Sequence, residues 1–154
     1  MLLAEEIKSI ERELVHCRAR RAAGVLALAA LQKSRGWVSD EALADLAAYL
    51  SLTVDELESV ATFYNHIYRR PVGRHVILVC DGIACWMLGG EDLKRHLFDR
   101  LGISFGQTTK DNRFTLLPNA CLGICDRAPA LMIDDDTYTG LTAGRIDEIL
   151  GTYE

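Results

Sequence analysis

The sequence predicts an α+β protein in which an N-terminal helical bundle precedes a small α/β domain. Apolar residues recur at helical spacing through residues 1–67, and short β-branched runs alternate with helical patterns in the remainder. A stretch rich in arginine, proline and glycine separates the two patterns, so we expect domains at 1–70 and 71–154. An apolar fraction of 49% over 154 residues suffices to bury two small cores.

Composition also limits the class of protein. The net charge is −5 and no apolar run approaches the roughly 20 residues of a membrane span, so no direct membrane insertion is expected. The first six residues carry two acids where a secretion signal has basic residues, which favours a cytoplasmic location. Five cysteines in that compartment are more typical of thiolate ligands or buried thiols than of structural disulfides.

Periodicity predicts the first two helices. Residues 2–16 place apolar side chains at spacings of three and four, with charged residues between them. This apolar stripe consists of Leu3, Ile7, Ile10 and Leu14. Residues 20–34 are dense in Ala, Leu and Val, which predicts a helix that is buried around much of its circumference and ends at Gly36.

Capping residues predict two further helices. Ser39 is the expected N-cap of the third helix, and acids in its first turn suit the helix dipole. Thr53 and Glu56 form a capping box for the fourth. The predicted buried faces are Ala42, Leu43, Leu46, Ala47 and Leu50 in the third helix and Leu57, Val60, Ala61 and Tyr64 in the fourth.

The segment between the two halves is basic. Arg69, Arg70 and Arg74 surround Pro71 and Gly73, which interrupt any helix. We expect a solvated hinge there rather than a recognition patch.

The second half predicts the order strand, helix, strand, strand, strand, helix. The expected elements are strands 76–79, 114–117, 130–133 and 138–141 and helices 90–101 and 142–150, with an acidic turn at 134–136. The first strand is apolar throughout and mostly β-branched, as in a strand buried on both faces. This order is typical of a small thioredoxin-like sandwich.

Four cysteines follow two of these strands. Cys80 and Cys85 begin where the first strand ends, and Cys121 and Cys125 follow the second. Parallel strands joined by a helical crossover end at the same edge of a sheet, so the two loops are expected to meet. This geometry predicts a site made of four thiolates.

Four thiolates suit zinc, a 2Fe-2S cluster or a 4Fe-4S cluster. The gaps of four and three residues differ from the two-residue gaps of zinc ribbons and 4Fe-4S ferredoxins, which favours 2Fe-2S. Gly82 and Gly123 let backbone N–H groups approach sulfur closely. Neither loop contains a histidine, and ligation by cysteine alone predicts a low reduction potential. Zinc, redox disulfides and inert thiols remain the alternatives. Cys17 lies outside both pairs and is expected to be a buried thiol on the first helix.

Several motifs, read in order from about Arg20 to Ile149, resemble one known family. They are Gly36-Trp37-Val38, Val60-Ala61-Thr62-Phe63-Tyr64, Pro71-Val72-Gly73-Arg74-His75, the Cys80–Cys85 loop, Leu117-Pro118 and Cys121-Leu122-Gly123-Ile124-Cys125 with Ala128-Pro129. The chain resembles the E subunit of bacterial complex I, the thioredoxin-like ferredoxin of the proton-pumping NADH:quinone oxidoreductase. No ligand position departs from the family pattern, and only residues 2–16 carry no family motif.

The resemblance implies that Cys80, Cys85, Cys121 and Cys125 bind one 2Fe-2S cluster. It implies a flavoprotein partner, the F subunit, which holds FMN and receives hydride from NADH, together with further complex I subunits peripheral to the inner membrane. Related E subunits serve NAD-linked hydrogenases and formate dehydrogenases, which are alternative hosts.

The residues agree with that division of work. The sequence has no G-x-G-x-x-G motif and no phosphate-binding loop, so nothing in it marks a nucleotide site. Hydride delivers two electrons and a 2Fe-2S cluster takes one, so a flavin on a neighbour must separate the pair. Trp86, Met87 and Leu88 are expected either to belong to the apolar surface that seals the cluster or faces that partner, or to pack in the core.

Three rival functions come from other classes. The third and fourth helices could form the helix-turn-helix of an iron-sulfur DNA-binding regulator, but residues 36–68 hold six acids and no Lys or Arg, and phosphates would repel such a face. A zinc-stabilised regulator or adaptor without a redox role would be colourless. A thiol-disulfide oxidoreductase would have two cysteines separated by two residues, and this pattern is missing.

Overall fold

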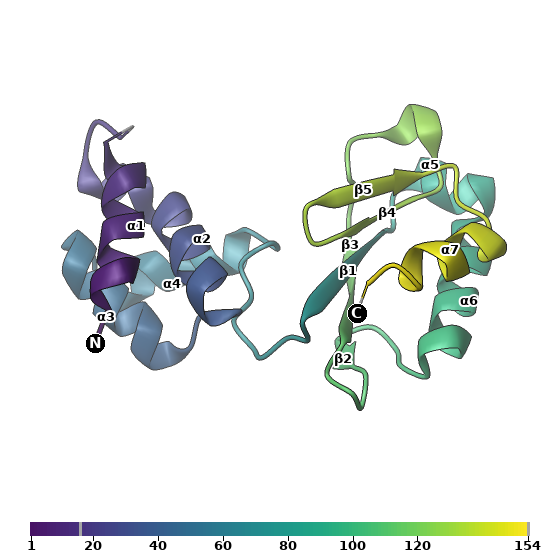
Figure 1. Ribbon diagram of the computed structural model, residues 1–154. Coiled ribbons are helices and arrows are strands. Elements are labelled where there is room, and N and C mark those ends of the chain that lie inside the picture. The colour runs from purple at the N-terminus through teal and green to yellow at the C-terminus, as the bar shows by residue number, and fades with distance from the viewer. Residues whose placement is uncertain (16, 154) are drawn as a thin grey trace. The chain divides into compact units, whose positions relative to one another are not determined.

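The computed structural model describes residues 1–15 and 17–153, which form two compact units, Met1–Pro71 and Val72–Glu154 (Figure 1). The first unit is helical, and the second is built around one sheet. In the described part of the chain, no helix has the length and apolar character that a membrane span requires.

The described residues of the first unit form four α-helices, as the sequence predicts. They are α1 (Ala4–Leu14), α2 (Gly24–Arg35), α3 (Asp40–Leu50) and α4 (Val54–Phe63), and a 3-10 turn, η1 (Arg20–Ala23), leads into α2. The predicted signals are present at their ends. The Ser39 hydroxyl accepts a hydrogen bond from the Ala42 N–H at 3.2 Å, Thr53 and Glu56 form the capping box, and Gly36 ends α2 with φ at +81°.

The core of this unit confirms the predicted face of α3 but corrects two other positions. All five predicted α3 side chains are buried, as are Leu57 and Ala61 of α4. Tyr64 is 44% exposed because α4 ends one residue before it, and its extended backbone leaves the helical stripe. Leu3 is 62% exposed because it is the N-cap of α1, so Leu2 packs against the core instead.

A buried ion pair joins α1 to α2. Glu6 is 2% exposed, and the Arg35 guanidinium donates to both of its carboxylate oxygens at 2.6 and 2.8 Å. The Leu3 N–H also donates to Glu6 at 2.8 Å. Chiefly through the hydrogen bonds from Arg35, and against the opposing effect of burial, the pKa of Glu6 falls from 4.5 to about 2. The Glu6 carboxylate is therefore charged and fully partnered inside the unit.

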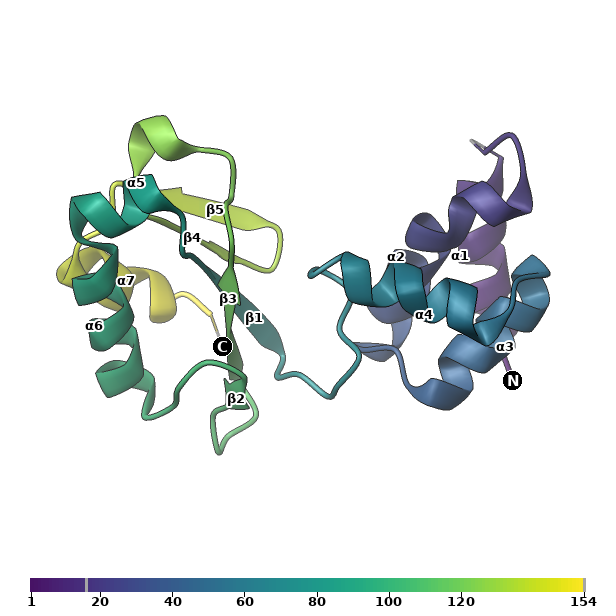
Figure 2. The same ribbon diagram turned by 180° about the vertical axis from the view of Figure 1, so that it is seen from behind.

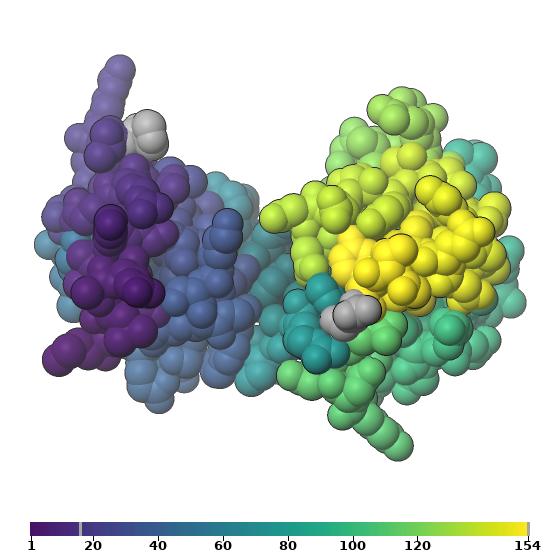
Figure 3. Space-filling view, viewed as in Figure 1, coloured from purple at the N-terminus to yellow at the C-terminus, as the bar shows by residue number. Residues whose placement is uncertain are grey.

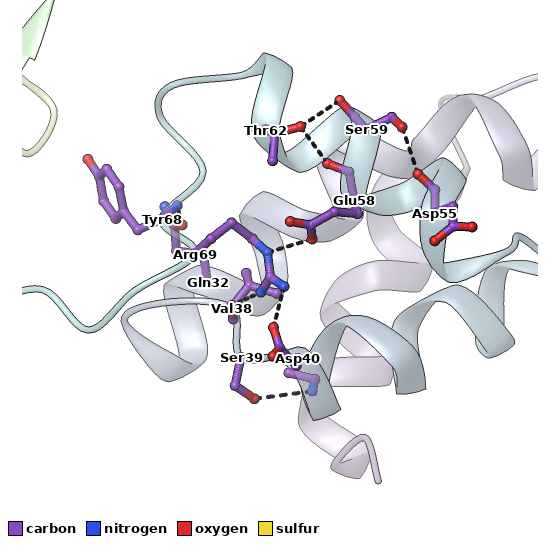
Figure 4. Close-up of polar contacts among 11 residues, drawn as sticks. Gln32, Val38, Ser39, Asp40, Asp55, Glu58, Ser59, Thr62, Tyr68 and Arg69 are labelled. Carbon is purple, nitrogen blue, oxygen red and sulfur yellow. Dashed lines mark hydrogen bonds and ion pairs between the residues drawn. The ribbon is translucent and has the colours of Figure 1, made fainter.

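Arg70 and Arg74 are exposed, as the sequence predicts, but the prediction of a solvated side chain is wrong for Arg69. Its guanidinium donates to Glu58 at 2.8 Å, to Asp40 at 2.7 Å and to the Val38 carbonyl, as Figure 4 shows. Its side chain is only 17% exposed. The planar guanidinium, with its five donors, links α4 to the start of α3. The sequence does not predict this contact, because Arg69 lies in a run of arginines and nothing local distinguishes it from its neighbours.

The second unit contains a five-stranded mixed sheet in the order β2-β3-β1-β4-β5. The strands are β1 (His75–Cys80), β2 (Gln107–Thr108), β3 (Phe114–Asn119), β4 (Ala130–Ile133) and β5 (Asp136–Thr139). The connecting elements are α5 (Ile83–Cys85), the π-helical turn η2 (Trp86–Gly90), α6 (Glu91–Leu101), η3 (Cys125–Arg127) and α7 (Ala143–Leu150). Strand β1 is central and pairs in parallel with β3, as predicted.

Helices α6 and α7 lie on the same side of the sheet in both views (Figure 1, Figure 2). Their apolar side chains share one core with alternate residues of β1 and β3. The chain then returns to the opposite end of β1 from the cysteines, where the Tyr153 ring packs on His75 with centroids 4.9 Å apart. In Figure 3 these C-terminal residues, in yellow, lie against the teal start of β1. Helices α6 and α7 and the C-terminal segment thus pack against β1, the strand that ends at Cys80.

Two strands differ from the prediction. Strand β2 was not expected, because two residues at the edge of a sheet are too short to produce an alternating pattern. Strand β5 begins at Asp136 and ends at Thr139, two residues earlier than predicted. The reversal is tighter than the acidic run suggests, because Asp134 adopts φ of +52° and only two residues separate β4 from β5.

Candidate metal centre

The two cysteine pairs leave the sheet at one edge. Cys80 is the last residue of β1 and is level with Asn119, the last residue of the parallel strand β3. The ladder continues one step further, because the Asp81 N–H donates to the Asn119 carbonyl at 2.8 Å. Cys121 follows two residues after β3 ends. Parallel pairing therefore brings both loops to the same place, as the strand-end argument predicts.

The sulfur atoms are close to one another and to backbone N–H groups. The Sγ atoms of Cys121 and Cys125 are 3.7 Å apart, and the Gly123 N–H donates to the Cys121 sulfur at 3.3 Å. Cys80 interacts with both Cys85 and Cys121, which joins the two loops. Gly123 has φ of +77°, a conformation that side chains rarely adopt, and this turns its N–H toward sulfur. The predicted role of Gly123 is confirmed.

Gly82 lies where the two loops come together. A Cβ on Gly82 would lie 3.3 Å from the Ala120 carbonyl oxygen, 3.5 Å from the Cys80 sulfur and 3.8 Å from the Cys121 sulfur. The backbone N–H of Gly82 also bonds the Cys80 sulfur. A side chain at this position would thus occupy the space next to two sulfurs, which glycine keeps open.

The two pairs differ in burial. Cys80 and Cys85 are 4% and 2% exposed and pack with Ala130, whereas Cys121 and Cys125 are exposed. Burial raises the pKa of Cys85 to about 11. Burial acts in the same direction on Cys80, but hydrogen bonds, led by those from the Gly82 and Leu122 N–H groups, bring its pKa below the usual value. The hydrogen bond shared with Cys121 raises the pKa of Cys125.

The segment on both sides of Cys85 projects large apolar side chains into solvent. Ile83 is 72% exposed, Trp86 55%, Met87 71% and Leu88 59%. We call these four residues the loop patch. The expectation that Trp86, Met87 and Leu88 pack in the core is therefore wrong. These side chains are exposed beside the cysteines.

The backbone of Gly90 comes very close to that of Cys85. A Cβ on Gly90 would lie 2.6 Å from the Cys85 carbonyl oxygen, which no other residue tolerates without a backbone shift. Leu88 and Gly89 leave helical conformation, and Gly89 has φ of +96°. Single π-helical turns of this kind often occur at functional sites. The turn begins directly after Cys85 and carries three residues of the loop patch.

Four soft thiol donors, backbone N–H groups aimed at sulfur and glycine-lined space fit an iron-sulfur group chemically. Across residues 1–15 and 17–153, no three His, Cys, Asp or Glu side chains are arranged to hold a metal ion. The assignment of Cys80, Cys85, Cys121 and Cys125 as ligands therefore stays a prediction.

Cys17 differs from what the sequence predicts. It is partly exposed and lies beyond the end of α1, with its N–H bonded to the Leu14 carbonyl at 3.0 Å. Helix α1 ends at Leu14, the last residue of the predicted apolar stripe, and residue 16 of the predicted range 2–16 lies outside the described residues. Cys17 belongs to the helical unit, not to the unit that holds the four-cysteine edge.

Sequence reasoning missed Lys94, which is 9% exposed near this edge. Its Nζ contacts Asp81, the residue after Cys80, and Glu91 at 2.6 Å. The spacing of Glu91 and Lys94 by three residues is a readable helical signal. The contact with Asp81 joins separate elements and has no sequence signal.

A profile of the thioredoxin-like 2Fe-2S ferredoxin family matches residues 10–154. The chain belongs to this family. It is 47% identical over 153 residues to the E subunits of NADH-quinone oxidoreductase from Pseudomonas aeruginosa and from Escherichia coli K12, covering 99% of this chain and 92% of each relative. The corresponding protein of Buchnera aphidicola from Acyrthosiphon pisum is 44% identical, with 99% and 94% covered.

Solved structures give the same fold. The crystal structure of an NAD+-reducing NiFe-hydrogenase in the H2-reduced state matches with a TM-score of 0.69 and 34% identity. The match covers 81% of this chain and 21% of the hydrogenase chain, so this chain spans about a fifth of the hydrogenase chain's length. The thioredoxin-like α+β fold predicted from the sequence is confirmed.

Proposed function

We propose that this chain is the electron-transfer subunit of an NADH-quinone oxidoreductase and carries one 2Fe-2S cluster on Cys80, Cys85, Cys121 and Cys125. The observation that carries the proposal is the meeting of two cysteine loops at the carboxyl ends of parallel β1 and β3. Membership of a 2Fe-2S ferredoxin family and 47% identity to E subunits support it.

When bound, the cluster would supply the acceptance and release of single electrons. The residues of this chain prepare its place. The N–H groups of Gly82, Leu122 and Gly123 bond to the cysteine sulfurs and stabilise their anionic form. Burial of Cys80 and Cys85 keeps water from one side of the site, while Cys121 and Cys125 lie at the surface, where an electron can enter or leave.

The electron donor belongs on another subunit. We infer a flavoprotein F subunit with FMN and an NADH site, because this sequence has no nucleotide-binding motif and hydride transfer needs a two-electron acceptor. With further complex I subunits, the assembly would be peripheral to the inner membrane. The acidic charge of the α3 and α4 region argues against contact with nucleic acid, and Asp40 and Glu58 of that region bind Arg69.

The loop patch is the surface we propose for contact with the flavoprotein. Ile83, Trp86, Met87 and Leu88 are large, apolar and exposed, and they adjoin Cys85. Aromatic residues and Met are enriched in protein interfaces, and their burial next to a cofactor excludes water. A Trp86→Ser, Met87→Ser variant should keep its visible spectrum but recover less flavoprotein on co-purification. A Phe63→Ser variant, altered at an exposed aromatic of the helical unit, is the matched control.

Reduction by NADH tests the proposed function. The complex purified with its flavoprotein should bleach its iron-sulfur absorbance when NADH is added anaerobically, whereas the isolated chain should bleach only with dithionite. Bleaching of the isolated chain by NADH would contradict the division of work between subunits.

An NAD-linked hydrogenase is the second candidate host, favoured by the structural match to the NAD+-reducing NiFe-hydrogenase. The lower identity, 34% against 47%, and the smaller covered share of the hydrogenase chain favour the quinone reductase. Subunits recovered with the chain decide between them: membrane subunits indicate the quinone reductase, and nickel indicates the hydrogenase.

A further inference from the structure

The first turn of α6 holds an enclosed ammonium group between two carboxylates. The Lys94 side chain is 11% exposed, and its Nζ contacts Asp81 Oδ1 and, at 2.6 Å, Glu91 Oε1. Both carboxylates are about half exposed. Lysine is almost never this buried unless it is paired, so the contact is a specific feature of this part of the unit.

These contacts join the two ends of one short segment. Asp81 directly follows Cys80, and Glu91 directly follows the π-helical turn. Residues 82–90 between them carry Cys85 and the whole loop patch. Lys94 therefore fastens both ends of the segment that presents Cys85, while the Asp81 N–H is fixed to Asn119 of β3.

The charge of this group is set by its surroundings. Burial opposes the charged form of Lys94, but hydrogen bonds from Nζ to Asp81 and Glu91 outweigh it and raise the pKa of the amine. The ammonium thus stays protonated at neutral pH. With Lys94 present, two carboxylates and one ammonium leave one net negative charge; without it, two negative charges stand next to the Cys80–Cys85 loop.

We propose that Lys94 is a positioning residue that holds the Cys80–Cys85 loop and raises the reduction potential of the group bound there. This inference rests on the proposed function, since it requires a redox group on the four cysteines. When bound, that group would accept one electron from the reduced flavin that we propose on the partner. No bond to Lys94 forms or breaks, and Lys94 keeps its proton before and after.

The sign follows from electrostatics. Reduction adds a negative charge to a group already held by anionic sulfur, so a nearby positive charge favours it and nearby negative charges oppose it. Removing the ammonium without its carboxylates should therefore lower the midpoint potential. Removing the Asp81 carboxylate should raise it. A purely structural disturbance has no reason to give opposite signs at two partners of one contact.

The test is an anaerobic redox titration of the purified protein with Lys94→Met. We expect about a tenfold fall in the equilibrium constant for one-electron reduction, which is about 59 mV downward. The matched control is Arg95→Met. It removes the same charge from the next residue of α6, but the Arg95 side chain is 74% exposed and pairs with Asp92. Its midpoint should stay close to that of the unchanged protein.

Two further variants keep the test decisive. Lys94→Arg should restore most of the potential, and Asp81→Asn should raise it, an outcome that remains measurable if Lys94→Met fails to retain iron. Hydrogen exchange of the metal-free protein gives a readout without the cluster: residues 82–90 should exchange faster in Lys94→Met and not in Arg95→Met.

The outcomes separate this inference from the proposed function. Equal midpoints in Lys94→Met, Arg95→Met and the unchanged protein, or a downward shift in Asp81→Asn, would overturn the role of Lys94 while leaving the electron carrier intact. An unchanged protein with no iron and no redox transition would overturn the proposed function itself.

Discussion

The two units bury polar groups in different ways. In the helical unit, Glu6 is buried against Arg35, and Arg69 binds Glu58 and Asp40, so each charge is matched inside the unit. In the sheet unit, Cys80 and Cys85 are buried next to backbone N–H groups, and their neighbours Cys121 and Cys125 reach the surface. The ion pairs of the helical unit satisfy one another, whereas the cysteine side chains gather at one edge of the sheet.

This difference shows what marks a candidate site in this protein. A buried charge alone does not, because the Glu6–Arg35 pair has the low-pKa carboxylate of a perturbed site and yet only joins two helices. The cysteine edge combines soft donors, a glycine, Gly82, whose Cβ would lie next to two sulfurs, and an exposed apolar patch. The presence of several independent features at one place distinguishes the candidate metal centre from an ion pair that only stabilises the fold.

The largest expected effect belongs to the cysteines. Cys121→Ser or Cys125→Ser should remove the visible absorbance and loosen the second unit, because a hydroxyl is a poor ligand for iron. Absorption spectra and iron assays of anaerobically purified protein measure this. Cys17→Ser, in the helical unit, is the control and should leave the spectrum unchanged. Loss of colour in Cys17→Ser would show that the ligand assignment is wrong.

The next largest effect is expected in the helical unit, when the buried ion pair loses its cation. Arg35→Met leaves the Glu6 carboxylate buried without its partner, which should destabilise the helical unit by about 3 kcal/mol. Chemical denaturation followed by circular dichroism measures it. The visible spectrum should persist, because the four cysteines lie in the other unit. Arg12→Met, at an exposed position of α1, should change stability by less than about 0.5 kcal/mol.

Acid should reproduce part of this effect. The pKa of Glu6 is lowered from 4.5 to about 2, so its contribution is fully present above pH 4.5 and disappears as pH falls toward 2. The loss should reach up to about 3 kcal/mol, at 1.36 kcal/mol for each pH unit. Denaturation midpoints measured between about pH 6 and about pH 2 test this. Glu6→Gln should flatten that dependence, and an equally steep profile in this variant would assign the acid sensitivity to other carboxyls.

The smallest effect sharpens the difference between the two cysteine pairs. In the metal-free protein, Cys85→Ser places a hydroxyl in a buried apolar position and should cost about 1–2 kcal/mol of stability. Cys121→Ser changes an exposed side chain and should cost less than about 0.5 kcal/mol. Equal costs in denaturation experiments would contradict the buried and exposed assignment of the two pairs.

Local signals in the sequence predicted the elements that local chemistry determines. Caps at Ser39 and Thr53, the stop at Gly36 and the apolar run of β1 all lie where the sequence predicts them. The four cysteines could be placed at one edge because parallel strands obey a general rule of connection.

Contacts between distant residues could not be predicted in this way. Arg69 and Lys94 are charged residues of the kind that is usually solvated. Only tertiary packing brings Asp40 and Glu58 to Arg69, and Asp81 to Lys94. Strand β2 exists because β3 offers it an edge, and two residues carry no period of their own. No spacing rule contains the close approach of Gly90 to Cys85 or the exposure of the loop patch.

The most direct test of the central claim is the metal content and electron spin resonance of the chain purified without oxygen. The account predicts a coloured protein with iron and acid-labile sulfide in equal amounts and, after dithionite, a signal of a reduced 2Fe-2S centre that disappears in Cys80→Ser and Cys125→Ser. A colourless, iron-free protein that is silent after dithionite would contradict it.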